Sequence, residues 1–135
     1  MTQEATMAFV TVIVLLSLVE YLYFGMAVGR SRAACEVEAP AVIGHATFER
    51  FFRAHQNTLE QLVIFIPAMY AAGYYASGLL AVALGVVFLI ARALYFRGYV
   101  ADPQRRGVGM ILTVVVNVLL LLCGLVGAVH YALAG

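Results

Sequence analysis

Four long apolar segments dominate this sequence, and they leave few folds open to the chain. They run over about residues 5–28, 48–75, 79–100 and 107–133. Each is close to the roughly 20 residues that a helix needs to cross a hydrocarbon core of about 30 Å. The chain is 64% hydrophobic and 11% charged, whereas a soluble domain has roughly 45–50% and about 25%. The sequence therefore predicts an all-α, integral membrane four-helix bundle, with residues 1–135 as a single domain.

The connections between the segments indicate how the helices alternate. Residues 76–78 form a short turn, so the second and third helices are expected to be an antiparallel hairpin. Asp102-Pro103 ends the third helix, because proline cannot continue the backbone ladder and disfavours helix in the residue before it. A polar stretch over residues 29–47 joins the first two helices. Alternating helices place the first and third connections at one membrane face.

All eight basic residues are arginines, and seven of them lie around the first and third connections. The seven are Arg30, Arg32, Arg50, Arg53, Arg97, Arg105 and Arg106. Basic residues gather in cytoplasmic loops of membrane proteins, so this face is predicted to be cytoplasmic. The composition hints at a bacterial source, and we expect a multi-pass protein of a bacterial inner membrane.

Glu20, Glu60 and Arg92 lie inside the apolar segments. Ionisable groups are costly there and usually face a bundle interior or a wet cavity. With a rise of about 1.5 Å per residue, Glu60 and Arg92 lie about 25 Å and 22 Å from the turn between their helices. Glu20 reaches a similar layer. The sequence predicts a polar cavity near the cytoplasmic face and a structural ion pair between Glu60 and Arg92.

Polar residues also recur at helical spacing on the second and third helices. The two stripes are Arg53, Asn57 and Glu60 on the second helix, and Arg92, Tyr95 and Tyr99 on the third. Residues spaced by three, four and seven positions share one side of a helix. The stripes are therefore able to line one pocket. Tyr95 and Tyr99 equally fit an aromatic belt at the membrane interface, where tyrosine is common.

Several other site classes lack a signal in the sequence. Neither the histidines nor the two cysteines, Cys35 and Cys123, have metal-ligand spacing. The chain carries neither a phosphate-binding glycine loop nor a nucleophile elbow. We expect no metal and no nucleic-acid partner.

The run Glu49–Glu60, ERFFRAHQNTLE, closely resembles the E-R-x-x-R-A-x-x-N-x-x-E motif of the MAPEG family, the membrane-associated proteins in eicosanoid and glutathione metabolism. The later run ARALYFRGYVADPQRR looks like the third-helix motif of that family, with Arg92, Tyr95 and Tyr99 in matching places. Arg106 matches a further arginine at the start of the fourth helix. The similarity covers essentially the whole chain.

The resemblance implies a homotrimer of four-helix protomers, with glutathione bound as co-substrate between neighbouring subunits near the cytoplasmic face. Carried over position by position, the contacts to glutathione are Arg53, Asn57, Glu60, Tyr95, Tyr99 and Arg106, with Arg32 and His55 also matching residues of some members. Arg106 is the expected catalytic residue, because the pKa of a thiol falls beside a cation.

The resulting interpretation is a glutathione-dependent enzyme that conjugates lipophilic electrophiles or reduces lipid hydroperoxides. Arginines bind the carboxylates of glutathione bidentately, Glu60 pairs with its ammonium group, and the lipophilic substrate arrives through the membrane. A non-catalytic lipid-binding scaffold of the same fold is the alternative. A small transporter or proton relay is disfavoured, since the chain lacks paired broken helices.

Overall fold

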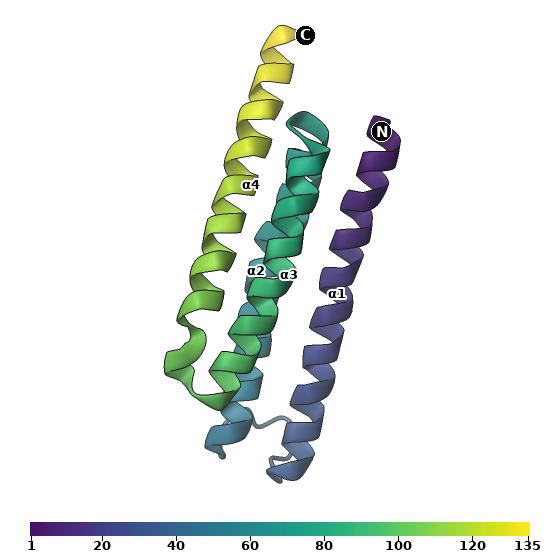
Figure 1. Cartoon of the computed structure of the whole chain (residues 1–135). Coiled ribbons are helices and arrows are strands. Elements are labelled where there is room, and N and C mark those ends of the chain that lie inside the picture. Colours follow the sequence, from purple (N-terminus) through teal and green to yellow (C-terminus); the bar gives the residue numbers. More distant parts are fainter.

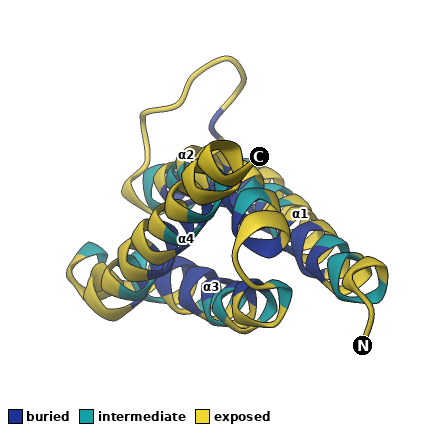
Figure 2. Cartoon of the chain, turned by 90° about the horizontal axis from the view of Figure 1, so that it is seen from above, coloured by how far each residue is buried: buried dark blue, intermediate teal, exposed yellow.

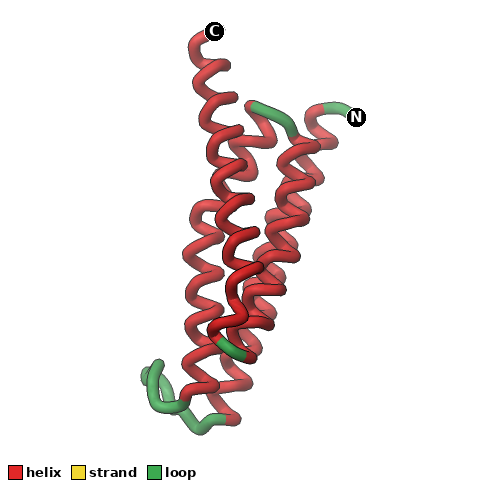
Figure 3. Tube along the Cα trace, turned by 60° about the vertical axis from the view of Figure 1, so that its left-hand side comes forward, coloured by secondary structure: helices red, strands yellow, loops and turns green.

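A computed structural model describes all 135 residues, and it contains four long helices and no strand (Figures 1 and 3). The elements are α1 (Gln3–Ala34), α2 (Ala46–Tyr75), α3 (Gly78–Ala101), the short 3₁₀-helix η1 (Pro103–Arg106) and α4 (Gly107–Ala134). The all-helical bundle expected from the four apolar segments is therefore present.

The four helices run alongside one another and alternate in direction (Figure 1). The two termini and the tight α2–α3 turn lie at one end of the bundle, and the α1–α2 and α3–α4 connections lie at the other. Both α1 and α4 pack against α2 and α3. Seen from above, the buried residues turn toward the space between the helices, and the exposed residues turn outward (Figure 2). The arginine-rich connections thus share one end of the bundle.

Three of the four helical regions, α1, α3 and the η1–α4 stretch, are long and apolar enough to cross a membrane. α2 falls outside this class because its first half carries the charged motif identified in the sequence. Large apolar side chains such as Leu22, Ile111 and Leu125 are exposed on the outer surface. An outer surface of this kind requires lipid rather than water as its solvent, so the chain is an integral membrane protein.

α1 extends further than the apolar segment predicts, to Ala34 rather than to about residue 28. Arginine and alanine, which are good helix formers, supply much of this extra stretch, so the helix continues beyond the apolar residues. It ends at Cys35, whose backbone N–H donates to the carbonyl of Ser31 at 2.9 Å. Glu36 follows with φ of 55°, a left-handed conformation that turns the chain away from the helix.

Stacked aromatic pairs hold the helices together at two levels. Phe65 of α2 and Phe88 of α3 stack with ring centroids 3.7 Å apart in the middle of the main core. Nearer the arginine-rich end, Phe24 of α1 and Phe96 of α3 stack at 4.1 Å. This second cluster also contains Tyr95. The stacked pair therefore holds α1 against α3 at the level of the polar stripe on α3.

α4 approaches α3 closely at Gly109. A Cβ atom at this position would lie 2.6 Å from the Cα atom of Tyr95 and 2.7 Å from the carbonyl oxygen of Ala91. Both neighbours are backbone atoms, so neither can move without shifting a helix. Small residues at such crossings allow helix backbones to pack closely in membranes.

Replacing Gly109 by alanine is expected to destabilise the protein by about 1–3 kcal/mol, because the added methyl group overpacks the crossing. Thermal unfolding in detergent measures the change. Gly107→Ala is the matched control, since Gly107 has helical φ and ψ and a Cβ there meets no atom within 4 Å. The control is expected to be neutral or to gain up to about 1 kcal/mol. Equal stability of the two variants would contradict the close crossing.

Candidate functional site

Arg92 of α3 is fully buried and joins three helices. Its Nη2 atom donates to Asn57 Oδ1 at 2.8 Å and to Thr58 Oγ1 at 2.9 Å, both on α2. Its Nη1 atom donates to Thr113 Oγ1 of α4 at 3.2 Å. A buried cation needs such partners to offset the loss of hydration. Arg92 therefore holds α2, α3 and α4 in register at the level of the polar stripes.

The two threonines are oriented by their own helices. Thr58 donates its hydroxyl proton to the carbonyl of Ala54 at 2.9 Å, and Thr113 donates to the carbonyl of Gly109 at 2.7 Å. The oxygen of each hydroxyl is therefore left to accept from Arg92. The guanidinium also lies over the ring of Tyr95, with Cζ 4.2 Å from the centroid, which adds a cation–π attraction.

The predicted ion pair between Glu60 and Arg92 is absent, and this prediction was wrong. The guanidinium bonds to an amide and two hydroxyls instead, and Glu60 is exposed. The depth estimate gives the height of a residue along its helix, but the rotation about the helix axis decides which side chain meets Arg92. At that rotation α2 presents Asn57 and Thr58.

The α2 stripe forms a polar edge on the outside of this network. Asn57 is half-buried and bonds to Arg92, whereas Arg53 and Glu60 on either side of it are exposed. Neither Arg53 nor Glu60 has a hydrogen-bond or ion-pair partner within the subunit. The edge thus presents one free cation, one free carboxylate and, between them, an amide fixed from inside the bundle.

Tyr95 and Tyr99 of α3 extend the site. Tyr95 is buried and Tyr99 is half-buried, and their rings stack with centroids 5.6 Å apart. The start of α4 lies beside this end of α3, since a Cβ on Gly109 would come 2.6 Å from the Cα atom of Tyr95. Three helices therefore bring predicted site residues to one region of the subunit.

Arg106 is exposed at the end of η1, and the local structure fixes its position. Its Nη1 atom donates to the carbonyl of Pro103 at 2.7 Å. Asp102 caps η1 through its side chain. η1 lies tightly against α3, since a Cβ on Gly98 would come 2.5 Å from the carbonyl oxygen of Arg105. Arg106 keeps further N–H donors that no group of the chain uses.

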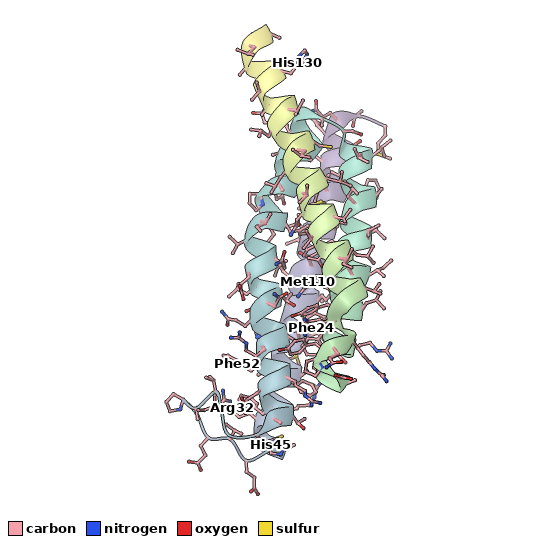
Figure 4. The ribbon with its side chains drawn as sticks, turned by 90° about the vertical axis from the view of Figure 1, so that its left-hand side faces the viewer. Phe24, Arg32, His45, Phe52, Met110 and His130 are labelled. Atoms are coloured by element: carbon pink, nitrogen blue, oxygen red, sulfur yellow. The ribbon has the colours of Figure 1, made fainter.

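Arg32 does not join this cluster. Its Nη1 atom donates to the carbonyls of Ala41 at 2.7 Å and Val37 at 3.3 Å, and its guanidinium lies 4.5 Å from the ring centroid of Phe48. Figure 4 shows Arg32 beside the α1–α2 loop, near His45. Its contacts therefore fasten that loop to the end of α1.

His55 also faces away from the cluster. Its ring stacks on Tyr21 of α1 with centroids 4.2 Å apart, and a Cβ on Gly25 would lie 3.2 Å from its Nε2 atom. His55 lies two positions after Arg53, which corresponds to a rotation of about 200° around α2. The structure therefore does not bring His55 to the ligand contacts expected on the Arg53 face of α2.

The sequence reasoning missed Thr58 and Thr113, which orient Arg92. A signal exists in α4, where Thr113 and Asn117 are polar, are spaced by four residues and interrupt an apolar segment. Asn117 is the second member of this pair, and its Nδ2 atom donates to Gln61 Oε1 of α2 at 3.1 Å. Polar residues at that spacing in an apolar helix indicate interhelical hydrogen bonds.

The chemistry of this region suits a ligand that carries both signs of charge. Arg53 and Arg106 offer cations for carboxylates or a thiolate, and Glu60 offers an anion for an ammonium group. Asn57 offers an amide. The structure gathers no group of three or more histidine, cysteine or acidic side chains that could hold a metal ion.

Comparison with known proteins places this geometry in context. The model of the MAPEG family matches residues 9–126. Microsomal glutathione S-transferase 2 from Homo sapiens is 40% identical over 113 residues, which are 84% of this chain and 77% of that protein. The protein of the same name from Bos taurus is 39% identical over 115 residues, 85% of this chain and 79% of its own length. Leukotriene C4 synthase from Cavia porcellus is 34% identical over 99 residues, with coverages of 73% and 66%.

Proposed function

Because the chain belongs to the MAPEG family, we propose that it is a glutathione-dependent membrane enzyme that conjugates lipophilic electrophiles, reduces lipid hydroperoxides, or does both. Similar proteins are named as glutathione transferases and leukotriene C4 synthase. The observation that carries the proposal is the polar edge of α2, where Arg53 and Glu60 are unpaired and Asn57 is held by Arg92.

Both kinds of charge on glutathione have a candidate partner on this edge. Glutathione carries two carboxylates and one ammonium group. Arg53 uses none of its donors within the subunit, so it is free for a bidentate contact with a carboxylate. Glu60 accepts from the ammonium group. Asn57 uses its oxygen for Arg92, so its Nδ2 atom remains to donate to a carbonyl or carboxylate of the ligand.

Arg106 is proposed to stabilise the thiolate of glutathione. One of its nitrogens donates to Pro103, and the others remain for the sulfur. In conjugation, the thiol proton leaves to solvent, the thiolate attacks the electrophilic carbon, and the leaving group departs with its electron pair. In peroxide reduction, two glutathione molecules become a disulfide while the hydroperoxide becomes an alcohol and water. The lipophilic partner reaches the site from the membrane.

A homotrimer is proposed to close the site. Arg53 and Glu60 are exposed on one subunit, and the larger cavities of the subunit are lined by other residues. A ligand bound at this open edge is exposed to water unless a second copy of the chain packs against it. Arg32 and His55 then remain candidates for contact from the neighbouring subunit. We also propose that α2 spans the membrane beside the other three helices, with the arginine-rich face cytoplasmic.

Isothermal titration of the purified protein in detergent with glutathione tests the proposal. S-methylglutathione is the matched ligand, because it keeps both carboxylates and the ammonium group but has no free thiol. We expect both ligands to bind and only glutathione to react with chlorinated nitroaromatics or lipid hydroperoxides. Binding of both without turnover would favour the lipid-binding scaffold, and binding of neither would refute the glutathione site.

Replacing Glu60 by glutamine is expected to weaken glutathione binding by about 10- to 100-fold, since a hydrogen bond to a charged group contributes about 1.5–3 kcal/mol. Folding should be unaffected because Glu60 is exposed and has no partner in the subunit. Titration with a glutathione analogue that lacks the amino group provides the control. We expect wild-type protein and the Glu60→Gln variant to bind that analogue with the same affinity. A full ten-fold loss with the analogue would show that Glu60 does not contact the ammonium group.

A further inference from the structure

A groove runs between α1 and α3 toward the arginine-rich end, and none of the expected glutathione contacts lines it. Its cavity volume is about 720 Å³. The wall is aromatic, since Phe24 and Phe96 stack at 4.1 Å and Phe51 meets Phe96 edge-on at 5.8 Å. Phe24 lies well inside the bundle (Figure 4). A wall of this kind suits an acyl chain.

Two arginines line the same groove. Arg30 lies near the end of α1 and Arg97 near the end of α3, both toward the arginine-rich face. Both are exposed, and neither donates a hydrogen bond to the rest of the chain. Arg30 has only the ring of Tyr23 nearby, at 5.9 Å from its centroid. Two free guanidinium groups in one cavity form a site for an anion with several oxygens, such as a phosphate.

Glu20 also lines the groove, ten residues before Arg30 and therefore about 15 Å deeper. Glu20 is half-buried and makes no side-chain hydrogen bond or ion pair within the chain. No ion pair joins Glu20 to Arg30 or Arg97, so the two guanidinium groups are left for an occupant of the groove. The groove is cationic at the membrane surface and mainly apolar along its length.

We propose that this groove binds one anionic glycerophospholipid of the surrounding leaflet. Its phosphate lies between Arg30 and Arg97, and an acyl chain lies along Phe24 and Phe96. The arrangement matches both halves of such a lipid: a polyoxygen anion at the headgroup level and a hydrocarbon chain below it. Basic pockets between membrane helices recognise anionic headgroups in this way. The site is separate from the proposed glutathione site and does not depend on it.

Native mass spectrometry of the full-length protein tests the proposal after purification from vesicles of phosphatidylglycerol and phosphatidylcholine. We expect the purified protein to retain bound phosphatidylglycerol in preference to phosphatidylcholine. The Arg30→Gln/Arg97→Gln variant is expected to lose this preference by roughly thirty-fold. Ala93→Leu, which fills the groove without removing a charge, is expected to reduce retention as well.

Arg50→Gln/Arg105→Gln is the matched control, because it removes two charges from the same end of the bundle but outside the groove. This control should keep most of the preference. Equal retention by the two double variants would overturn the proposal, and so would equal retention of phosphatidylcholine by the wild type. Displacement of the lipid by inorganic phosphate would instead assign the arginines to a free anion. Absence of any retained lipid would leave a second copy of the chain as the occupant.

Discussion

Replacing Arg106 by alanine is expected to reduce glutathione conjugation at pH 6.5 by roughly fifty-fold, because the thiolate fraction falls by about that factor. The proposed role of Arg106 is to favour the thiolate over the thiol. Lowering the pKa of a thiol from about 8.5 to about 6.5 takes roughly 2.7 kcal/mol of preferential thiolate stabilisation, which is a factor of about 100. A partly desolvated guanidinium beside the sulfur is a sufficient source for this stabilisation.

The ultraviolet absorbance of the thiolate measures this effect directly when glutathione is added. Wild-type protein should show the band at pH 6.5, and the Arg106→Ala variant should not. Arg105→Ala is the control, because Arg105 is the adjacent exposed arginine of η1 and makes no side-chain hydrogen bond. An unchanged band in Arg106→Ala, or an equal loss in both variants, would remove Arg106 from the mechanism.

Replacing Arg92 by alanine is expected to destabilise the protein by about 3–5 kcal/mol, the largest stability effect of any single substitution considered. The change removes a fully buried side chain and three hydrogen bonds that cross between helices. It leaves a cavity where α2, α3 and α4 meet. Thermal or denaturant unfolding in detergent measures the loss.

Arg92→Met separates the structural role of Arg92 from its positioning role. Replacing buried charged groups by apolar residues of similar volume is often neutral for stability, so this variant should recover much of what alanine loses. It cannot hold the oxygen of Asn57. We therefore expect a raised KM for glutathione with the thiolate band retained at saturation. A normal KM in Arg92→Met would show that Arg92 serves folding alone.

The sequence was sufficient to predict the helices, because each apolar segment is long and a polar stretch, a short turn or a proline separates it from the next. The least accurate boundary is the end of α1. The polarity of residues 29–34 predicts a connection, but these residues are helical in the structure. Their helix propensity and the hydrogen bonds of Arg32 to Val37 and Ala41 stabilise this last part of α1. Polarity indicates where a helix leaves the membrane, which is a different point from where the helix ends.

The site was predicted less completely, and the errors share one physical cause. The spacing of Arg53, Asn57 and Glu60 puts them on one face of α2. The spacing does not determine how far α2 is rotated about its axis relative to α3. A few tens of degrees decide whether Glu60 or Asn57 meets Arg92. The orientation of His55 toward Tyr21 depends on the same angle.

Both ends of the polypeptide emerge on one side of the bundle, opposite the arginines (Figure 1). A flexible linker on that side is therefore able to join the last residue of one copy to the first residue of the next with no additional membrane crossing. Tandem polypeptides of this kind allow a single defective repeat to be placed among intact ones. The residual turnover, measured as the number of defective repeats increases, would reveal how many catalytic centres work independently and whether each is built by one repeat or by two.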